Sequence, residues 1–185
     1  MSARDLIAAF SARRRPAEMR PEVFRQALSL ADLDLLHSFV GGAEGFERFA
    51  RALVRFPTIE RLHLLPTRPR EGVSALDWLP LLRAFLKSRG LACEVRVDPD
   101  NVVLLGQDDQ VLQDALTAAR RILSAIPATE PPAPILADLS TGARTVSLAL
   151  ALACLQEERE VQFLGIRYDA EGGAPPEPIA FSRPL

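Results

Sequence analysis

Small hydroxyl residues, glycines and arginines gather where apolar runs of the sequence end. The clearest group is L-S-T-G-A-R at 139–144, which follows the apolar run 135–138. Two others are H-S-F-V-G-G at 37–42 and P-T-R-P-R at 66–70. Hydroxyl donors, guanidinium groups and the free amides of a helix N-terminus together suit a phosphate, and glycine lets a backbone approach the anion closely. These three segments are therefore the candidates for an anion site.

Several familiar catalytic motifs are absent from the sequence. The G-G-A-E-G at 41–45 departs from the dinucleotide fingerprint, and neither a P-loop nor a G-x-S-x-G nucleophile motif occurs. A structural zinc site needs about four ligands, and Cys93, Cys154, His37 and His63 have no recognised zinc spacing. We expect no metal and no cofactor. Both cysteines lie in apolar runs and are expected to be buried free thiols.

Composition narrows the class of protein further. The chain has 185 residues, of which 48% are apolar and 25% charged, with a formal net charge of −2. This length and apolar content support one domain with a buried core, and the near-neutral charge argues against binding long nucleic acid. No apolar run reaches the ~20 residues that span a bilayer, and residues 1–10 lack the apolar stretch of a signal peptide. We expect a soluble, cytoplasmic protein without a membrane partner.

Strands and helices are predicted to alternate along most of the chain. Apolar runs predict strands at 33–40, 59–65, 93–97, 135–138, 161–168 and 179–182, and helical spacing of apolar residues predicts helices at 44–55, 74–90, 112–123 and 145–155. This alternation predicts an α/β fold, a Rossmann-like three-layer sandwich with a mostly parallel central sheet. It would occupy residues 31–185, after a short helical extension over 1–30 in which Pro21 suits a first turn. In such sheets ligands bind at the carboxyl ends of the strands, where the three segments lie.

The helix expected from residue 74 has recognisable ends. Ser74 and Asp77 have the spacing of a capping box, and Gly90 favours the left-handed conformation that closes helices. Pro80 comes early enough to be tolerated but is expected to bend the helix. Trp78 lies on the apolar face, so we expect a core residue rather than a platform on which a ligand stacks.

The segment 138–150 resembles a motif of the CARF (CRISPR-associated Rossmann fold) domains. Here it reads D-L-S-T-G-A-R-T-V-S-L-A-L, and the family pattern is approximately D-[IVL]-[ST]-G-G-T-K-x-M-[SA]-x-A-L. The positions that fit are Asp138, Ser140, Gly142, Ser147, Ala149 and Leu150. Arg144 stands where the family has lysine, and the other departures are Thr141, Ala143 and Val146. The order of the predicted strands also fits, so the resemblance covers about 32–182.

The resemblance implies a ligand and a symmetric partner. CARF domains are typically homodimers that bind cyclic oligoadenylate, the second messenger of type III CRISPR antiviral defence, across the two-fold axis. Carried over to this sequence, the ligand-binding residues are Val40, Gly41, Gly42, Thr67, Arg68, Ser140, Thr141 and Gly142, and the catalytic residues are Ser38 and Arg144. The ring size is open, with cyclic tetra-adenylate favoured.

A stand-alone CARF chain resembles the ring nucleases, which end the signal by linearising the messenger. The ribose 2′-OH attacks the neighbouring phosphodiester without a metal, leaving a 2′,3′-cyclic phosphate. Arg144 is expected to stabilise the charge of the phosphorane, and Ser38 to position the phosphate. His37 is either a general base or a core histidine, and His63 is expected to be a core residue. Two alternatives remain open: a non-catalytic sensor that controls an effector or partner, and an unrelated Rossmann-like nucleotide-binding module.

Overall fold

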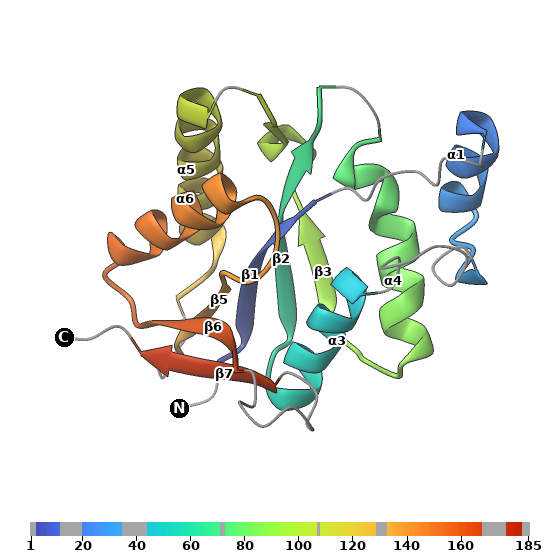
Figure 1. The fold of residues 1–185 in the computed structure, drawn as a ribbon. Helices are drawn as coiled ribbons and strands as arrows, with labels where there is room; N and C mark the ends of the chain where they lie inside the picture. The colour runs from blue at the N-terminus through green and yellow to red at the C-terminus, as the bar shows by residue number, and fades with distance from the viewer. Residues whose placement is uncertain are drawn as a thin grey trace.

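A mostly parallel β-sheet runs through the centre of the protein in a computed structural model (Figure 1). The structure describes residues 3–11, 20–34, 44–70, 73–106, 108–128, 133–167 and 177–182. Within these, the strands are β1 (Asp5–Phe10), β2 (Arg61–Arg68), β3 (Glu94–Val97), β4 (Val103–Leu104), β5 (Ile135–Asp138), β6 (Val161–Arg167) and β7 (Glu177–Ser182). Their order is β3-β2-β1-β5-β6-β7, with β4 beside the end of β2. The pairing of β6 with β7 is antiparallel and the other described pairings are parallel.

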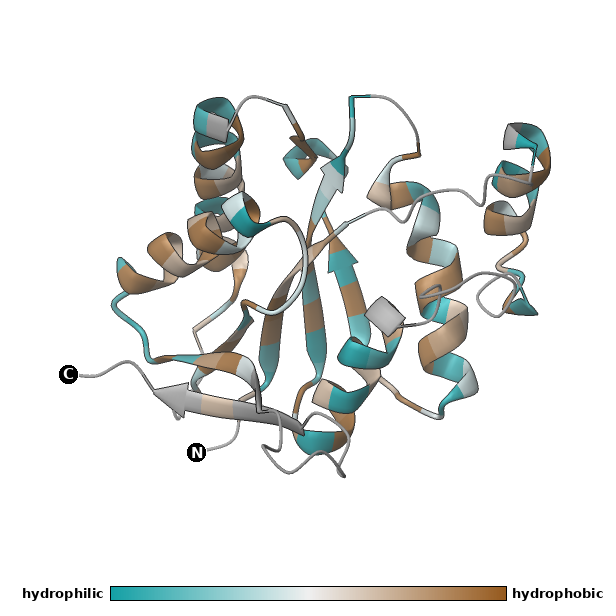
Figure 2. Ribbon diagram, in the orientation of Figure 1, coloured by the Kyte–Doolittle hydropathy of each residue, from teal (hydrophilic) through white to brown (hydrophobic). Residues whose placement is uncertain are grey.

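Helices cover both faces of the sheet and complete the predicted three-layer α/β sandwich (Figure 1). On one face pack α1 (Pro21–Ser29), α3 (Glu44–Arg55) and α4 (Leu79–Ser88), the last preceded by the 3₁₀ turn η1 (Ala75–Trp78). On the other face pack α5 (Asp108–Ala125) and α6 (Arg144–Leu155). Apolar and polar residues alternate over 61–64 of β2 and along β3 (Figure 2), and successive residues of a strand point to opposite faces of the sheet. Among the described helices, none combines the length and the apolarity needed to cross a membrane.

The expected helical extension over 1–30 is wrong at its first element, because Asp5–Phe10 is the central strand β1. Its sequence, D-L-I-A-A-F, contains two alanines and a leucine, which favour helix by intrinsic propensity. All six residues are buried, and β1 pairs with β2 on one side and with β5 on the other. The pairing of β1 with β2 and β5 therefore outweighs the helical preference of its sequence. The second part of the expectation is confirmed, since α1 begins at Pro21.

The other predicted elements differ from the structure mainly at their ends. Strand β5 and helix α3 have the predicted bounds. Strand β2 continues through Pro66, because β4 pairs with Thr67 and Arg68 beyond it. Of the strand expected over 33–40, Leu33 and Asp34 are described and neither lies in a strand, while residues 35–40 fall outside the described residues.

The predicted capping box is present at the start of η1, the turn that leads into α4. Asp77 accepts a hydrogen bond from the Ser74 amide at 2.9 Å, and the Ser74 hydroxyl accepts one from the Leu76 amide at 3.3 Å. Pro80 then falls in the first turn of α4, where a missing N–H costs no helical hydrogen bond. Gly90 has a φ of +68°, as expected for a residue that ends a helix.

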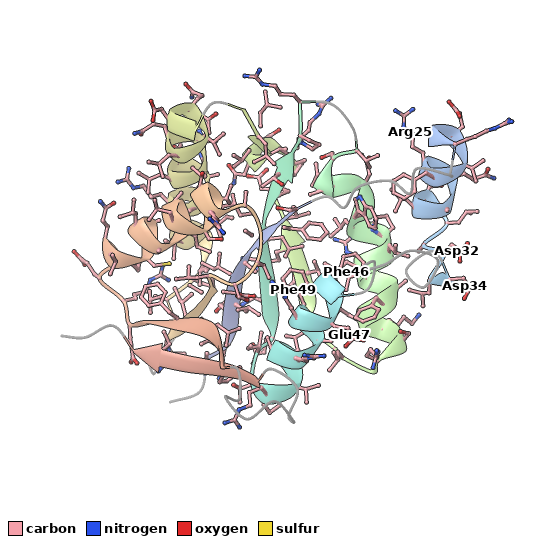
Figure 3. All side chains as sticks on the ribbon, viewed as in Figure 1. Arg25, Asp32, Asp34, Phe46, Glu47 and Phe49 are labelled. Atoms are coloured by element: carbon pink, nitrogen blue, oxygen red, sulfur yellow. The ribbon has the colours of Figure 1, made fainter. Side chains whose placement is uncertain are left out.

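Aromatic side chains fill the layer between the sheet and α3, α4 and η1. Trp78 is fully buried, which confirms its predicted core position, and its ring centroid lies 5.4 Å from that of Phe24 and 6.3 Å from that of Phe46. Phe46 and Phe49 extend from α3 toward Phe10 of β1, with centroids 6.3 and 6.2 Å away (Figure 3). This packing fixes α3 against the end of β1.

The two cysteines are free thiols. Cys154 is buried, as predicted, and burial, with a smaller contribution from the charge of Glu157, raises the pKa of its thiol to about 12. Cys93 is only half-buried, and burial again raises the pKa of its thiol. Neither thiol is activated for nucleophilic chemistry.

Candidate functional site

The carboxyl ends of β1 and β5 lie side by side at the point where the strand order reverses. From β1 the sheet continues to β2 and β3 on one side, and to β5 and β6 on the other. In open α/β sheets the connections diverge at such a point and leave a crevice in which ligands bind. The loop 139–144, which we predicted as a strand exit, follows β5 here, and Ser11 follows β1. These two segments define the candidate site.

Gly142 holds the loop 139–144 directly against the end of β1. Its φ is +83°, in the region that L residues with side chains rarely adopt. A Cβ built on it would lie 2.4 Å from the Cβ of Ala9, far closer than two carbons can approach, and 3.6 Å from the Ser11 Oγ. Both the backbone conformation and the available space therefore require glycine at this position.

Asp138 and Ser140 fix the first turn of the same loop. The Asp138 Oδ1 accepts hydrogen bonds from the Ser140 amide at 2.8 Å and from the Ser140 hydroxyl at 2.6 Å. Burial raises the pKa of the Asp138 carboxyl, and these hydrogen bonds only partly oppose that effect. From α3, Arg48 Nη1 donates to the Ser140 carbonyl at 2.6 Å. Asp138, the acidic residue of the motif, therefore stabilises the conformation of the loop through its hydrogen bonds to Ser140.

Thr141 leaves a polar atom buried without a partner. Its carbonyl accepts a hydrogen bond from the Ser147 hydroxyl at 2.7 Å, but its own Oγ1 is buried and has no hydrogen-bond partner in the described part of the chain. Buried hydroxyls are normally satisfied, and one left unpaired costs about 1–3 kcal/mol. Because this oxygen is closed off from solvent, a ligand could accept its hydrogen bond only after the Thr141 side chain turns outward.

The first turn of α6 adds positive charge next to the loop. The N-cap residue, Ala143, has no side chain that could cap the helix, so the first amides of α6 are not capped by a side chain. Arg144, the first residue of α6, is exposed. The N-terminal end of a helix carries a partial positive charge, and Arg144 places a guanidinium beside it. Together they can hold a phosphate oxygen.

Thr67 and Arg68 reach the same edge of the sheet at the end of β2. Thr67 is fully buried and its hydroxyl lies 3.2 Å from the Ser11 Oγ and 3.5 Å from the Phe10 carbonyl. Arg68 is exposed. Thr67 therefore joins the ends of β1 and β2, and its buried hydroxyl donates to Ser11; its ligand role stays a prediction.

Sequence reasoning missed Ser11 because β1 was expected to be helical. Ser11 lies between the Thr67 hydroxyl and the position that a Cβ of Gly142 would take. The exit of the first strand is therefore Ser11 and not the segment 37–42. Of the residues assigned to that segment, Ser38, Val40, Gly41, Gly42 and His37 all lie outside the described residues. The apolar run L-I-A-A-F at 6–10, followed by a serine, is the signal that could have identified this strand.

Comparison of the chain with models of known protein families and with curated proteins finds no match. The resemblance of 138–150 to the CARF motif therefore stays a prediction. The candidate site rests on the geometry of the loop 139–144 and its neighbours in the described part of the chain.

Proposed function

We propose that the chain binds a cyclic oligoadenylate at the carboxyl edge of the sheet, as a homodimer, and cleaves it as a metal-independent ring nuclease. The observation that carries this proposal is the loop 139–144. It has a fixed shape, an unpartnered Thr141 hydroxyl, and the start of α6 with Arg144 beside it. The CARF-like sequence of 138–150 supports the identity of the ligand.

A cyclic oligoadenylate suits a nearly neutral protein. The ring carries one negative charge per phosphate, so a few local donors are enough to hold it. Arg144 supplies a planar guanidinium that can hold a phosphate through two hydrogen bonds, and the amides of α6 and the Thr141 hydroxyl supply further donors. The formal net charge of −2 is compatible with such a local site.

An exposed apolar stripe on α6 supports the homodimer. Leu148, Leu152 and Leu155 have exposed fractions of 52, 36 and 48%. Residues four apart lie on one face of a helix, so Leu148 and Leu152 continue the face that begins at Arg144. A second copy on this stripe would cover the leucines and bring two Arg144 side chains to one two-fold axis. The ring would then lie between two equivalent half-sites.

Cleavage in this site is an internal transfer at phosphorus. The ribose 2′-oxygen forms a bond to the adjacent phosphorus as the bond from phosphorus to the 5′-oxygen breaks; the 2′-OH loses its proton and the 5′-oxygen gains one. The product has a 2′,3′-cyclic phosphate and a 5′-OH. Arg144 stabilises the negative charge that develops on the phosphorane, and the Thr141 hydroxyl, once its side chain turns outward, donates to a non-bridging oxygen.

The proposal is tested by melting temperatures and product analysis with cyclic tetra-adenylate, cyclic hexa-adenylate and linear tetra-adenylate. We expect a cyclic ring to raise the melting temperature of the wild-type protein, and R144A to lose most of that shift and to cut cleavage by roughly 100-fold or more. The matched control is R4A, which removes an exposed arginine at the opposite edge of the sheet, where it pairs with Glu60 at 3.8 Å. Equal loss in both variants contradicts the site.

The same experiment separates the two alternatives. A ring that binds and stays intact would identify a sensor rather than a nuclease. If no cyclic oligoadenylate changes the melting temperature, the result contradicts the proposal and favours an unrelated nucleotide-binding module.

A further inference from the structure

A second cluster of polar residues lies on the α5 side of the sheet, near the starts of β1 and β2. The parallel register places Asp5 opposite Arg61, and Ile7 opposite His63. The Asp5 carboxylate is buried and accepts hydrogen bonds from Arg61 Nε and Nη2 at 2.7 and 2.8 Å. His63 Nε2 lies 2.8 Å from the Asp5 Oδ1. None of these residues belongs to the loop at the carboxyl edge.

The ionised state of Asp5 decides which nitrogen of His63 carries the proton. Burial alone would raise the pKa of the Asp5 carboxyl, but the hydrogen bonds from His63 and Arg61, with the charge of Arg61, outweigh it and lower the pKa below its ordinary value. An ionised carboxylate only accepts hydrogen bonds, so His63 Nε2 is the protonated donor. In the neutral imidazole, Nδ1 then holds the lone pair, and no described residue hydrogen-bonds to it. Asp5 thus orients His63 as a hydrogen-bond acceptor.

His63 lines a cavity of about 450 Å³ between β3 and the last turn of α5. This volume is within the range of pockets that hold small organic ligands. Polar side chains reach the cavity from three further elements, through Arg83 of α4, Arg96 of β3 and Arg121 of α5. Ile122 and Ala125 add apolar surface from α5.

The three arginines retain unused donors. Arg83 donates to the Val95 carbonyl at 3.3 Å, Arg96 to Glu94 at 2.8 Å, and Arg121 to the Asn101 Oδ1 at 3.3 Å. A guanidinium has five N–H donors, so each keeps several for a ligand. Two carboxylates, Glu94 and Asp98, also line the cavity, which leaves one positive charge in excess.

One wall of the cavity is fixed by a short relay of hydrogen bonds. Asn101 is buried, donates from Nδ2 to Asp98 at 3.0 Å and accepts from Arg121. The buried Asn101 therefore gives the Arg121 guanidinium one fixed hydrogen-bond acceptor at the cavity wall. This preorganisation reduces the entropy lost when a ligand binds.

We propose that this cavity is a second ligand site, which binds a small organic phosphate monoester. Arg96 and Arg121 hold the phosphate, the organic part lies on Ile122 and Ala125, and the His63 Nδ1 accepts a hydrogen bond from a hydroxyl of the ligand. Binding here does not depend on the loop 139–144, so this site is independent of the proposed recognition of cyclic oligoadenylate.

The imidazole of His63 provides a direct measurement, because the chain has only two histidines. Proton–nitrogen spectra of the side chains, assigned with H37Q, should show a proton on His63 Nε2, hydrogen-bonded to Asp5. Titration with ribose 5-phosphate or adenosine 5′-monophosphate should shift the His63 signals saturably, and neutral ribose should not. Inorganic phosphate should compete with either ligand, since it takes the same donors.

Two adjacent arginines of α5 provide the matched variants. Arg121 faces the cavity, whereas Arg120 bonds to Gln156 outside it. R121A should weaken binding of the phosphate ligands by about tenfold or more, while R120A and R144A should leave it unchanged. The proposal is overturned if neither ester shifts His63, if ribose shifts it equally, if R120A weakens binding as much as R121A, or if His63 is protonated at Nδ1.

Discussion

Replacing Gly142 with alanine tests the packing that shapes the candidate site. The new Cβ would start 2.4 Å from the Ala9 Cβ, about 1 Å inside ordinary contact at 3.4 Å. Overpacking of this kind costs about 1–3 kcal/mol, and a left-handed φ costs a residue with a side chain another ~1–2 kcal/mol. We therefore expect G142A to lower the free energy of unfolding by about 2–5 kcal/mol.

Variants at Gly90 and Ala9 separate the cost of overpacking from the cost of backbone strain. Gly90 also has a positive φ, +68°, but a Cβ there would meet nothing within 4 Å. G90A should therefore lose only the ~1–2 kcal/mol of backbone strain. Removing the opposing methyl group with A9G should leave G142A with the strain alone, so the double-mutant cycle of A9G and G142A should yield a favourable coupling of about 1–3 kcal/mol.

Urea denaturation measures these differences. With a slope of about 2 kcal/mol/M, G142A should lower the midpoint by about 1–2.5 M, and G90A by about 0.5–1 M. G142A should also weaken any ligand held by the loop 139–144, whereas G90A should not. If G142A and G90A destabilise the protein equally, or if A9G does not reduce the cost of G142A, the close contact of the loop with β1 is refuted.

Two further predictions concern the core and the proposed dimer. D5N leaves Arg61 and His63 without their buried carboxylate, so it should cost about 3–5 kcal/mol at neutral pH. The pKa of Asp5 is lower in the folded protein than its unfolded value of 3.8. The negative charge of Asp5 therefore stabilises the folded state above pH 3.8, and this stabilisation is lost as the pH falls through the folded pKa. Urea titrations at several pH values should show this slope in the wild type and a smaller one in D5N; equal slopes contradict the pairing. L148E/L152E charges the exposed stripe of α6 and should give a monomer by light scattering, while V54E, on an exposed site of α3, should not change the mass. A dimer that survives L148E/L152E excludes this face as the interface.

The part of the site that follows β5 could be predicted from sequence. Asp138, Ser140 and Gly142 lie in one short segment between an apolar run and a helix, so local patterns are sufficient to place them. The same holds for the capping box at Ser74 and the closing Gly90, which depend on residues close in sequence.

The missed features depend on contacts between distant residues. Strand β1 contains helix-favouring alanines, and only its pairing with β2 and β5 makes it the central strand. Because of this error Ser11 was overlooked and the first strand exit was placed at 37–42. The hydrogen bond between Asp5 and His63 joins residues 58 positions apart, through a register that no local pattern reveals. His63 is buried, as predicted, but its partner Asp5 could not be foreseen.

Calorimetric titration with cyclic tetra-adenylate, followed by analysis of the products, tests the proposed function most directly. We predict saturable binding of one ring per two chains, linear products ending in a 2′,3′-cyclic phosphate, and loss of both in R144A but not in R4A. Absence of heat with rings of four and six adenylates, or full binding by R144A, would contradict the proposal that the loop after β5 recognises a cyclic oligoadenylate.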